Sequence, residues 1–96
     1  MKTAQEKNYA ILFIDDEEKS GKYFKKIFES EYKVYNATRA KEALEILKDK
    51  FHEIAIVISD QRMPEMTGVE IMNIIKVSNP SITRILTTVP SSRELS

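Results

Sequence analysis

Hydrophobic and polar positions alternate along this chain in blocks that predict four strands separated by three helices. Two blocks, residues 9–14 and 54–60, are almost wholly apolar and rich in β-branched side chains, which is typical of strands covered on both faces. Residues 32–36 alternate less cleanly and predict a shorter, more exposed strand, and residues 82–88 predict a fourth. Each of the two apolar blocks ends in, or runs directly into, an acidic residue.

The first two predicted helices have apolar residues at helical spacing. Residues 17–29 begin with an acidic turn that suits the helix dipole. We expect this helix to face the core through Tyr23, Phe24, Ile27 and Phe28. Residues 39–48 predict the second helix, with Thr38 as a reasonable N-cap. Its apolar positions are Ala40, Ala43, Leu44 and Leu47.

The third predicted helix starts at a capping box. Thr67 is the expected N-cap, and Glu70 lies three residues further on, where its carboxylate can reach back to the backbone of Thr67. The helix should end before Asn79-Pro80, because a residue that precedes proline disfavours helical backbone.

Strict alternation of strands and helices predicts an α/β fold, with a parallel sheet, helices on both faces and right-handed crossovers. The two long apolar strands should be central neighbours, which gives the strand order 2-1-3-4. The crossover direction reverses between strands one and three, and a crevice opens at their carboxyl ends at such a point. Asp15, Asp16 and Asp60 are expected to project into this crevice.

Three carboxylates in one crevice favour a bound cation, because like charges raise one another's pKa. The chain has no cysteine and a single histidine, His52, so oxygen ligands and a hard divalent ion, Mg²⁺ above all, are expected. Such an ion keeps positions for a phosphoryl oxygen, which would allow Asp60 to act as a nucleophile and form an acyl phosphate. The alternative is structural, since acidic residues also cap helices and begin turns.

Composition restricts the remaining classes. Ninety-six residues fit one domain, which we expect over 1–96 with irregular ends at 1–8 and 89–96. Lys plus Arg and Asp plus Glu number 15 each, and this balance argues against non-specific binding of nucleic acid. No apolar run approaches the ~18 residues of a membrane span, and the polar amino end lacks a secretory signal. We therefore expect no membrane association and a cytoplasmic protein.

Two stretches carry a family resemblance. Ile11-Leu12-Phe13-Ile14-Asp15-Asp16-Glu17 and Ile58-Ser59-Asp60-Gln61-Arg62-Met63-Pro64-Glu65-Met66-Thr67-Gly68 together resemble the receiver domain of two-component response regulators, the CheY-like superfamily. The resemblance spans about residues 9–88. It implies a flavodoxin-like doubly wound sheet in which Asp60 accepts a phosphoryl group from a histidine kinase or phosphotransfer protein. It also implies that Asp16 binds Mg²⁺ directly, Asp15 mostly through water, and the backbone carbonyl of Arg62 completes the set.

The family also places a Ser or Thr at the end of the fourth strand, where its hydroxyl turns towards the phosphoryl group. The resemblance assigns this role to Thr88, with Thr87 as runner-up because a shift of one residue exchanges their faces. The structural alternative is that both threonines are present simply as strand formers.

The sequence departs from the family pattern after the fourth strand. A complete receiver continues through a fourth helix, a fifth strand bearing a Lys and a fifth helix, whereas this sequence stops at Ser96. We expect a truncated or shortened receiver without these elements and without an output domain. Its fourth strand would be an unprotected edge carrying Ile82, Ile85 and Leu86, which we expect self-association to hide.

Three functions remain at this stage. The first is a phospho-switch, which is not an enzyme and at most assists its own phosphorylation and dephosphorylation. The second, motivated by the missing Lys, is a receiver-like interaction or dimerisation module that is not phosphorylated. The third is an independent Mg²⁺-dependent phosphatase using Asp60, which would need a second catalytic acid where Arg62 stands.

Overall fold

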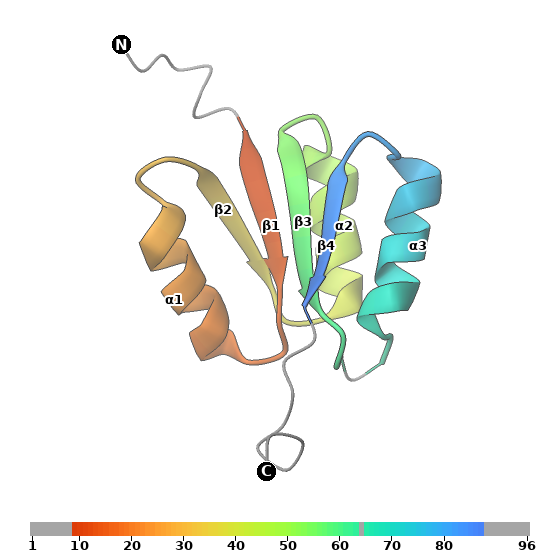
Figure 1. Cartoon of the computed structure of the whole chain (residues 1–96), viewed down its shortest axis with the longest axis horizontal. Coiled ribbons are helices and arrows are strands. Elements are labelled where there is room, and N and C mark those ends of the chain that lie inside the picture. Colours follow the sequence, from red (N-terminus) through yellow and green to blue (C-terminus); the bar gives the residue numbers. More distant parts are fainter. Residues whose placement is uncertain (1–8, 64, 88–96) are drawn as a thin grey trace.

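The computed structural model describes residues 9–63 and 65–87, which form a parallel sheet with helices on both faces (Figure 1). Its elements follow the chain as β1 (Ala10–Ile14), α1 (Glu18–Phe28), β2 (Lys33–Ala37), α2 (Ala40–Lys50), β3 (Ile54–Asp60), α3 (Gly68–Ser78) and β4 (Thr83–Thr87). The strand order β2-β1-β3-β4 confirms the predicted topology, and every neighbouring pair is parallel. The ends predicted to be irregular, 1–8 and 89–96, lie outside the described residues.

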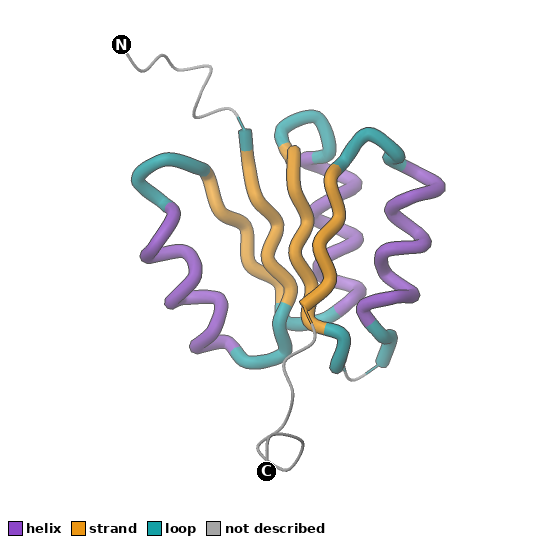
Figure 2. The backbone as a smooth tube through the Cα atoms, viewed as in Figure 1, coloured by secondary structure: helices purple, strands orange, loops and turns teal. Residues whose placement is uncertain are grey.

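Strands and helices alternate without exception along the described residues (Figure 2). This part of the chain therefore has four strands and three helices, and a fourth helix, a fifth strand and a fifth helix have no counterpart in it. Within the same residues, no helix is long and apolar enough to cross a membrane.

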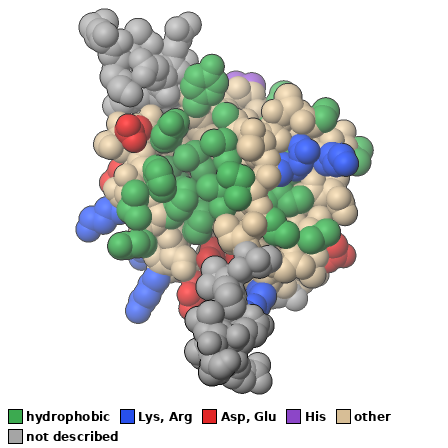
Figure 3. Space-filling model, in the orientation of Figure 1, with side chains coloured by type: hydrophobic (Ala, Val, Ile, Leu, Met, Phe, Trp, Pro, Cys, Tyr) green, Lys and Arg blue, Asp and Glu red, His purple; other side chains and the backbone are tan. Residues whose placement is uncertain are grey.

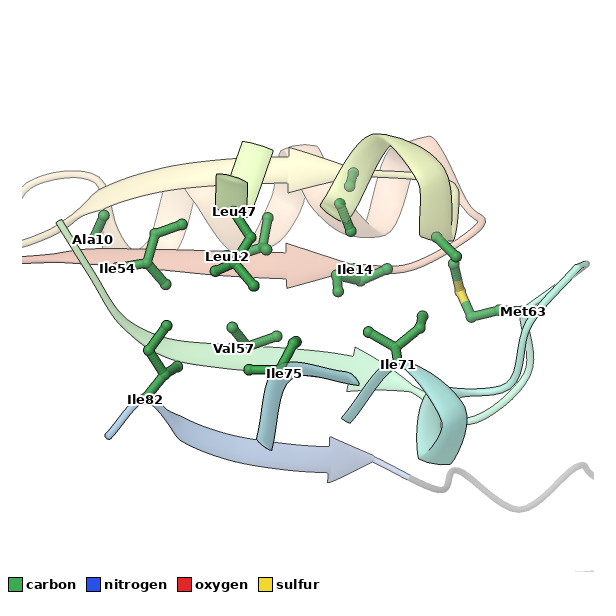
Figure 4. Close-up of a cluster of buried hydrophobic side chains, with 13 residues drawn as sticks. Ala10, Leu12, Ile14, Leu47, Ile54, Val57, Met63, Ile71, Ile75 and Ile82 are labelled. Atoms are coloured by element: carbon green, nitrogen blue, oxygen red, sulfur yellow. The ribbon is translucent and has the colours of Figure 1, made fainter. Parts of the chain in front are cut away.

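The core lies between the sheet and the pair α2 and α3 (Figure 4). Leu12 of β1 and Val57 of β3 are register partners, so their side chains leave the sheet on this same face. They meet Leu47 of α2 and Ile71 and Ile75 of α3, and all five side chains are buried. Burying each such side chain stabilises the fold by about 1.5–3 kcal/mol, which makes this cluster the main source of stability.

The opposite face of the sheet carries α1, which packs mainly against β1 and β2. Phe24 of α1 stacks on Phe13 of β1 with ring centroids 4.3 Å apart, and Phe28 extends the stack. Tyr23 and Ile27 are 70% and 54% exposed, so the prediction that they belong to the helix core is wrong. Because α1 covers only half of this face, one flank of its apolar stripe has no packing partner among the residues that the structure describes.

The beginnings of α2 and α3 differ from each other. The prediction of Thr38 as N-cap of α2 is wrong, since Arg39 is the N-cap residue and makes no side-chain capping bond. Thr38 instead donates its backbone N–H to the Glu42 carboxylate at 2.9 Å. At α3 the predicted capping box is confirmed: Thr67 accepts from the Glu70 N–H, and the Glu70 side chain accepts from the Thr67 N–H. 

The last strand, β4, lies at the edge of the sheet, as predicted. Ile85 and Leu86 alternate between its two faces, and they are 43% and 36% exposed. Ile82 is buried, however, and does not belong to the exposed edge as predicted. It precedes β4 and joins the core cluster beneath α3.

Candidate functional site

The three carboxylates predicted to converge do lie together at the carboxyl end of the two central strands. Ile14 pairs with Ser59 across β1 and β3, so the residues that follow them reach the same edge of the sheet. One ligand oxygen from each of Asp15, Asp16 and Asp60 lies within 4.8 Å of the others. The strand order produces this arrangement, because β1 and β3 are neighbours although α1, β2 and α2 separate them in sequence.

Asp15 has a raised pKa within this acidic cluster. Partial burial raises its pKa above the ordinary 3.8, and the charges of Asp60, Asp16 and Glu17 raise it further. The backbone N–H of Glu17 acts in the opposite direction, because it donates to Oδ1 of Asp15 at 2.9 Å and stabilises the ionised form. A cation bound between the carboxylates would remove the repulsion that remains.

Asp60 is half-buried, so its carboxylate is held by the fold yet remains within reach of solvent. Its Oδ1 accepts the backbone N–H of Arg62 at 3.3 Å, which turns the loop after β3 back towards the carboxylate. The preceding residue, Ser59, is fully buried and donates its hydroxyl to the backbone carbonyl of Asp60 at 3.0 Å. One bond holds the backbone of Asp60 and the other holds its side chain, so the end of β3 is fixed. 

An open hollow adjoins the acidic cluster. It is lined by Asp16, Gln61, Arg62, Met63 and Thr67, which places the β1–α1 loop opposite the β3–α3 loop. The hollow is open to solvent beside the acidic cluster. Met63 lines the hollow, is buried and belongs to the core cluster.

Gln61 has a structural role that the sequence analysis missed. Its backbone N–H donates to the Thr87 carbonyl of β4 at 3.1 Å, and its own carbonyl accepts from the Gly68 N–H at 3.1 Å. Its side-chain Oε1 accepts from the Val69 N–H in the first turn of α3, at 3.0 Å. The residue after Asp60 thus joins β3, β4 and α3. Gln61 lies too far from α3 in sequence for any capping pattern to have indicated this contact.

Gly68 allows α3 to begin close to the end of β3. A Cβ at this position would lie 2.7 Å from the Asp60 carbonyl oxygen and 3.0 Å from the Gln61 Cα, and it would also clash with the Leu86 side chain. Only a residue without a side chain fits this approach, so Gly68 is required by packing and not by backbone conformation.

Of the two threonines considered for the switch hydroxyl, Thr88 lies outside the described residues. Thr87 is the register partner of Asp60, so the two side chains leave the sheet on the same face. The Thr87 hydroxyl donates to the Ser59 carbonyl at 3.3 Å. The switch role of either threonine stays a prediction, as do the ligand roles of Asp15, Asp16 and Arg62.

The donor set of the cluster fits a hard cation. All its ligand atoms are carboxylate oxygens, and none of the described histidine nitrogens is near, because His52 is an exposed residue beside Glu53 at the other end of β3. Opposite ligands of an octahedral Mg²⁺ are about 4.2 Å apart, close to the upper limit of 4.8 Å between these oxygens. The cluster can therefore accept such an ion with small side-chain movements.

Fold and site together define a class of protein: a doubly wound parallel sheet with an acidic cluster at the topological switch point. The family model for the response regulator receiver domain matches residues 11–95, and the chain belongs to this family. The match includes β3, all of β1 except its first residue, and the acidic ends of both strands.

Individual relatives agree with this assignment. The hydrogenase transcriptional regulatory protein HoxA of Cupriavidus necator is 31% identical over 81 residues, which cover 84% of this chain and 16% of HoxA. The chain thus spans a small part of the length of this curated relative.

Solved structures give the same family. A response regulator receiver domain protein from Clostridium thermocellum superposes with a TM-score of 0.82 at 30% identity, covering 91% of this chain and 70% of that one. The signal receiver domain of an HD domain-containing protein from Pseudomonas fluorescens Pf-5 has a TM-score of 0.79 at 29% identity, with the same coverage of 91% and 70%. A CheY-like receiver protein from Methanospirillum hungatei JF-1 also reaches 0.79 at 29% identity, covering 90% and 68%.

Proposed function

We propose that this chain is a phospho-accepting receiver whose Asp60 takes a phosphoryl group from a phosphohistidine of a histidine kinase or phosphotransfer protein. One observation carries the proposal: in a member of the receiver family, Asp60 ends a central strand with Asp15 and Asp16 beside it. Asp60 is half-buried, and the open hollow lined by its neighbours Asp16, Gln61 and Arg62 offers a donor a route towards it.

The transfer exchanges one bond to phosphorus for another. A carboxylate oxygen of Asp60 attacks the phosphorus, the P–N bond to the donor histidine breaks, and the imidazole leaves with the electron pair and takes a proton from solvent. The bond between Arg62 N–H and Asp60 Oδ1 leaves the second oxygen, Oδ2, as the better placed nucleophile. The chain acts as an acceptor and not as an enzyme in its own right.

We propose Mg²⁺ as the cofactor of this site. Asp15, Asp16 and Asp60 would hold the ion, with the backbone carbonyl of Arg62 completing the set. Its positive charge would offset the negative charges of the carboxylates and of the phosphoryl oxygens during transfer. Independently of the ion, the Arg62 N–H holds the Asp60 carboxylate, and the Ser59 hydroxyl holds the backbone carbonyl of Asp60, before the donor arrives.

The proposal extends to the switch that follows phosphorylation. The added charge would draw the hydroxyl of Thr88, or of Thr87, towards the phosphoryl group. This movement would change the relative populations of two pre-existing conformations of an interaction surface. Gln61 bonds both to the Thr87 carbonyl and to the start of α3, so a movement at the end of β4 would be transmitted to that helix.

The test is mass spectrometry after incubation with acetyl phosphate and Mg²⁺. We expect a mass increase of one phosphoryl group that requires Mg²⁺ and that Asp60→Asn abolishes. Asp49→Asn is the matched control, because this exposed carboxylate lies near the end of α2 and should leave phosphorylation unchanged. An unchanged mass for the wild-type chain would overturn the proposal.

A second candidate, an interaction module that is not phosphorylated, is favoured by the exposed edge of the sheet. Ile85 and Leu86 expose apolar surface on both faces of β4, and such an edge is a template for association. In line with it we propose that the chain self-associates. Binding of Mg²⁺ without any phosphorylation would favour this second candidate over the first.

A further inference from the structure

Gln61 makes three hydrogen bonds, and only one of them depends on its side chain. Its backbone N–H and C=O bond to Thr87 and Gly68, and any residue other than proline can make these two bonds. The third bond is donated by the Val69 N–H to the side-chain oxygen Oε1, at 3.0 Å. Because an N–H can only donate, the atom that faces Val69 must be the amide oxygen. A side chain without an acceptor at this point cannot replace Gln61.

The first turn of α3 needs acceptors of this kind, because the first N–H groups of a helix have no partner within the helix. Here the Gly68 N–H bonds to the Gln61 carbonyl, the Val69 N–H to the Gln61 side chain, and the Glu70 N–H to the Thr67 hydroxyl. Thr67 is a local cap, whereas Gln61 comes directly after the last residue of β3. The Gln61 side chain therefore ties α3 to the strand that ends in the proposed phosphoryl acceptor.

This tie reaches the acidic cluster through Arg62, the next residue along the chain. The Arg62 N–H donates to Oδ1 of Asp60 at 3.3 Å, a long bond that a small rotation of the backbone would break. Gln61 stands between these two residues, held to β4 by its N–H and to α3 by its side chain. Figure 3 shows acidic side chains at the lower end of this side of the molecule, where the strands finish. The tie thus holds the backbone of Arg62 beside a group of carboxylates that reaches the surface.

We propose that Gln61 is a positioning residue of the phosphoryl-accepting site. By accepting the Val69 N–H, its side chain fixes the backbone of Arg62, whose N–H orients the Asp60 carboxylate and whose carbonyl completes the proposed Mg²⁺ ligands. The inference rests on the proposed function and adds a residue to it. Residues that orient the ligands of a metal from outside typically change its affinity, or the activity, by about 10–100-fold when they are replaced.

The competing explanation is that the side chain only stabilises α3, and three variants separate the two roles. Gln61→Met has a side chain of similar length without an acceptor oxygen. Gln61→Glu keeps an oxygen for the Val69 N–H, at the positive end of a helix where a carboxylate is favourable. Glu70→Ala is the matched control, because it removes the other half of the capping box at the same helix start and leaves Gln61 unchanged.

The tie itself is measured by hydrogen exchange in NMR spectra, without Mg²⁺ and without phosphorylation. The Val69 N–H should exchange about tenfold faster in Gln61→Met than in wild type, and Gln61→Glu should restore its protection.

The effect on the site is measured from the initial rate of phosphorylation by acetyl phosphate, followed by mass. High salt screens the charge that Gln61→Glu adds. In Gln61→Met the rate should fall on the order of tenfold, and the Mg²⁺ concentration for half the maximal rate should rise severalfold. Gln61→Glu should stay within about twofold of wild type, because the bond to Val69 is retained. Glu70→Ala should lose stability in urea and keep the wild-type rate.

Each outcome decides the inference. A folded Gln61→Met chain that is phosphorylated at the wild-type rate would overturn it and leave the proposed function intact. An equal loss of rate in Glu70→Ala, or a slow Gln61→Glu chain with a protected Val69 N–H, would overturn it as well. A wild-type chain that accepts no phosphoryl group would overturn both. If circular dichroism shows Gln61→Met to be unfolded, Gln61→Asn takes its place, because its side chain is one carbon too short to bring the oxygen to Val69.

Discussion

On the face that α2 and α3 cover, Leu12 and Val57 have no exposed surface, whereas on the α1 face Ile58 is half-buried and Ile85 is exposed. These residues come from three strands of one sheet, and their apolar character is the same. The difference lies in what covers them, because in the described part of the chain two helices cover one face and a single helix covers half of the other. Burial in this fold thus depends on the helix layer and not on the strand sequence.

The first prediction compares one residue from each face and has the largest expected effect. Leu12→Ala should lower the free energy of unfolding by about 3–5 kcal/mol, because it leaves a cavity in a closed core. Ile85→Ala should cost about 1 kcal/mol or less in the monomer, because solvent already reaches the side chain. Urea unfolding at low micromolar concentration, below self-association, measures both. Equal losses would mean that the α1 face is covered in solution.

The second prediction uses one glycine from each face. Gly68→Ala should destabilise the fold by about 1–3 kcal/mol, because its methyl group meets the rigid backbone at the end of β3. For Gly21→Ala, the three atoms nearest to the new methyl group all belong to the Asn36 side chain, the closest at 3.0 Å, and a side chain can shift more easily than backbone. The gain in helix propensity, up to ~1 kcal/mol, should offset that contact and leave stability nearly unchanged.

Thermal unfolding of the two alanine variants, followed by circular dichroism, checks this contrast. An unchanged stability for Gly68→Ala would contradict this prediction. It would mean that α3 can move away from the end of β3, and that the packing of the α2–α3 face does not need this close approach of Gly68 to the strand. A large loss for Gly21→Ala would instead show that α1 is held more tightly than its exposed flank indicates.

The strand order and the convergence of Asp15, Asp16 and Asp60 could be predicted from the sequence. Both follow from the alternation of elements and from the length of two apolar strands, and rules of crossover handedness leave few other topologies. The capping box at Thr67 was equally accessible, since it depends on residues three positions apart. 

Features that depend on tertiary placement could not be predicted. The stripe containing Tyr23 and Ile27 has a correct helical period, but the period does not reveal how many strands the helix covers. Gln61 bonds to Thr87 and Val69, which approach it only after the sheet and α3 have formed. At α2, Arg39 takes an extended conformation and displaces the predicted cap by one residue.

The smallest expected effect concerns pH, and it compares the two ends of the sheet. At the carboxyl end, the raised pKa of Asp15 means that the folded chain binds more protons than the unfolded chain between pH 3.8 and the folded pKa. Stability from this group is therefore lost as pH rises through that window. At the amino end, the Tyr35 hydroxyl donates to Glu53 at 2.8 Å and lowers its pKa, so Glu53 contributes stability that is lost as pH falls.

Variants separate these opposite contributions. Asp15→Asn should raise the free energy of unfolding at pH 7 by about 0.5–1 kcal/mol, a small gain because solvent screens a partly exposed carboxylate. The gain should vanish near pH 3, where Asp15 is protonated in both states. Mg²⁺ should stabilise the wild-type chain at pH 7 but not this variant, whereas Glu53→Gln should respond like wild type. Because the ion would bind only where like charges converge, a Mg²⁺ effect that survives in Asp15→Asn would place the cation away from the acidic cluster.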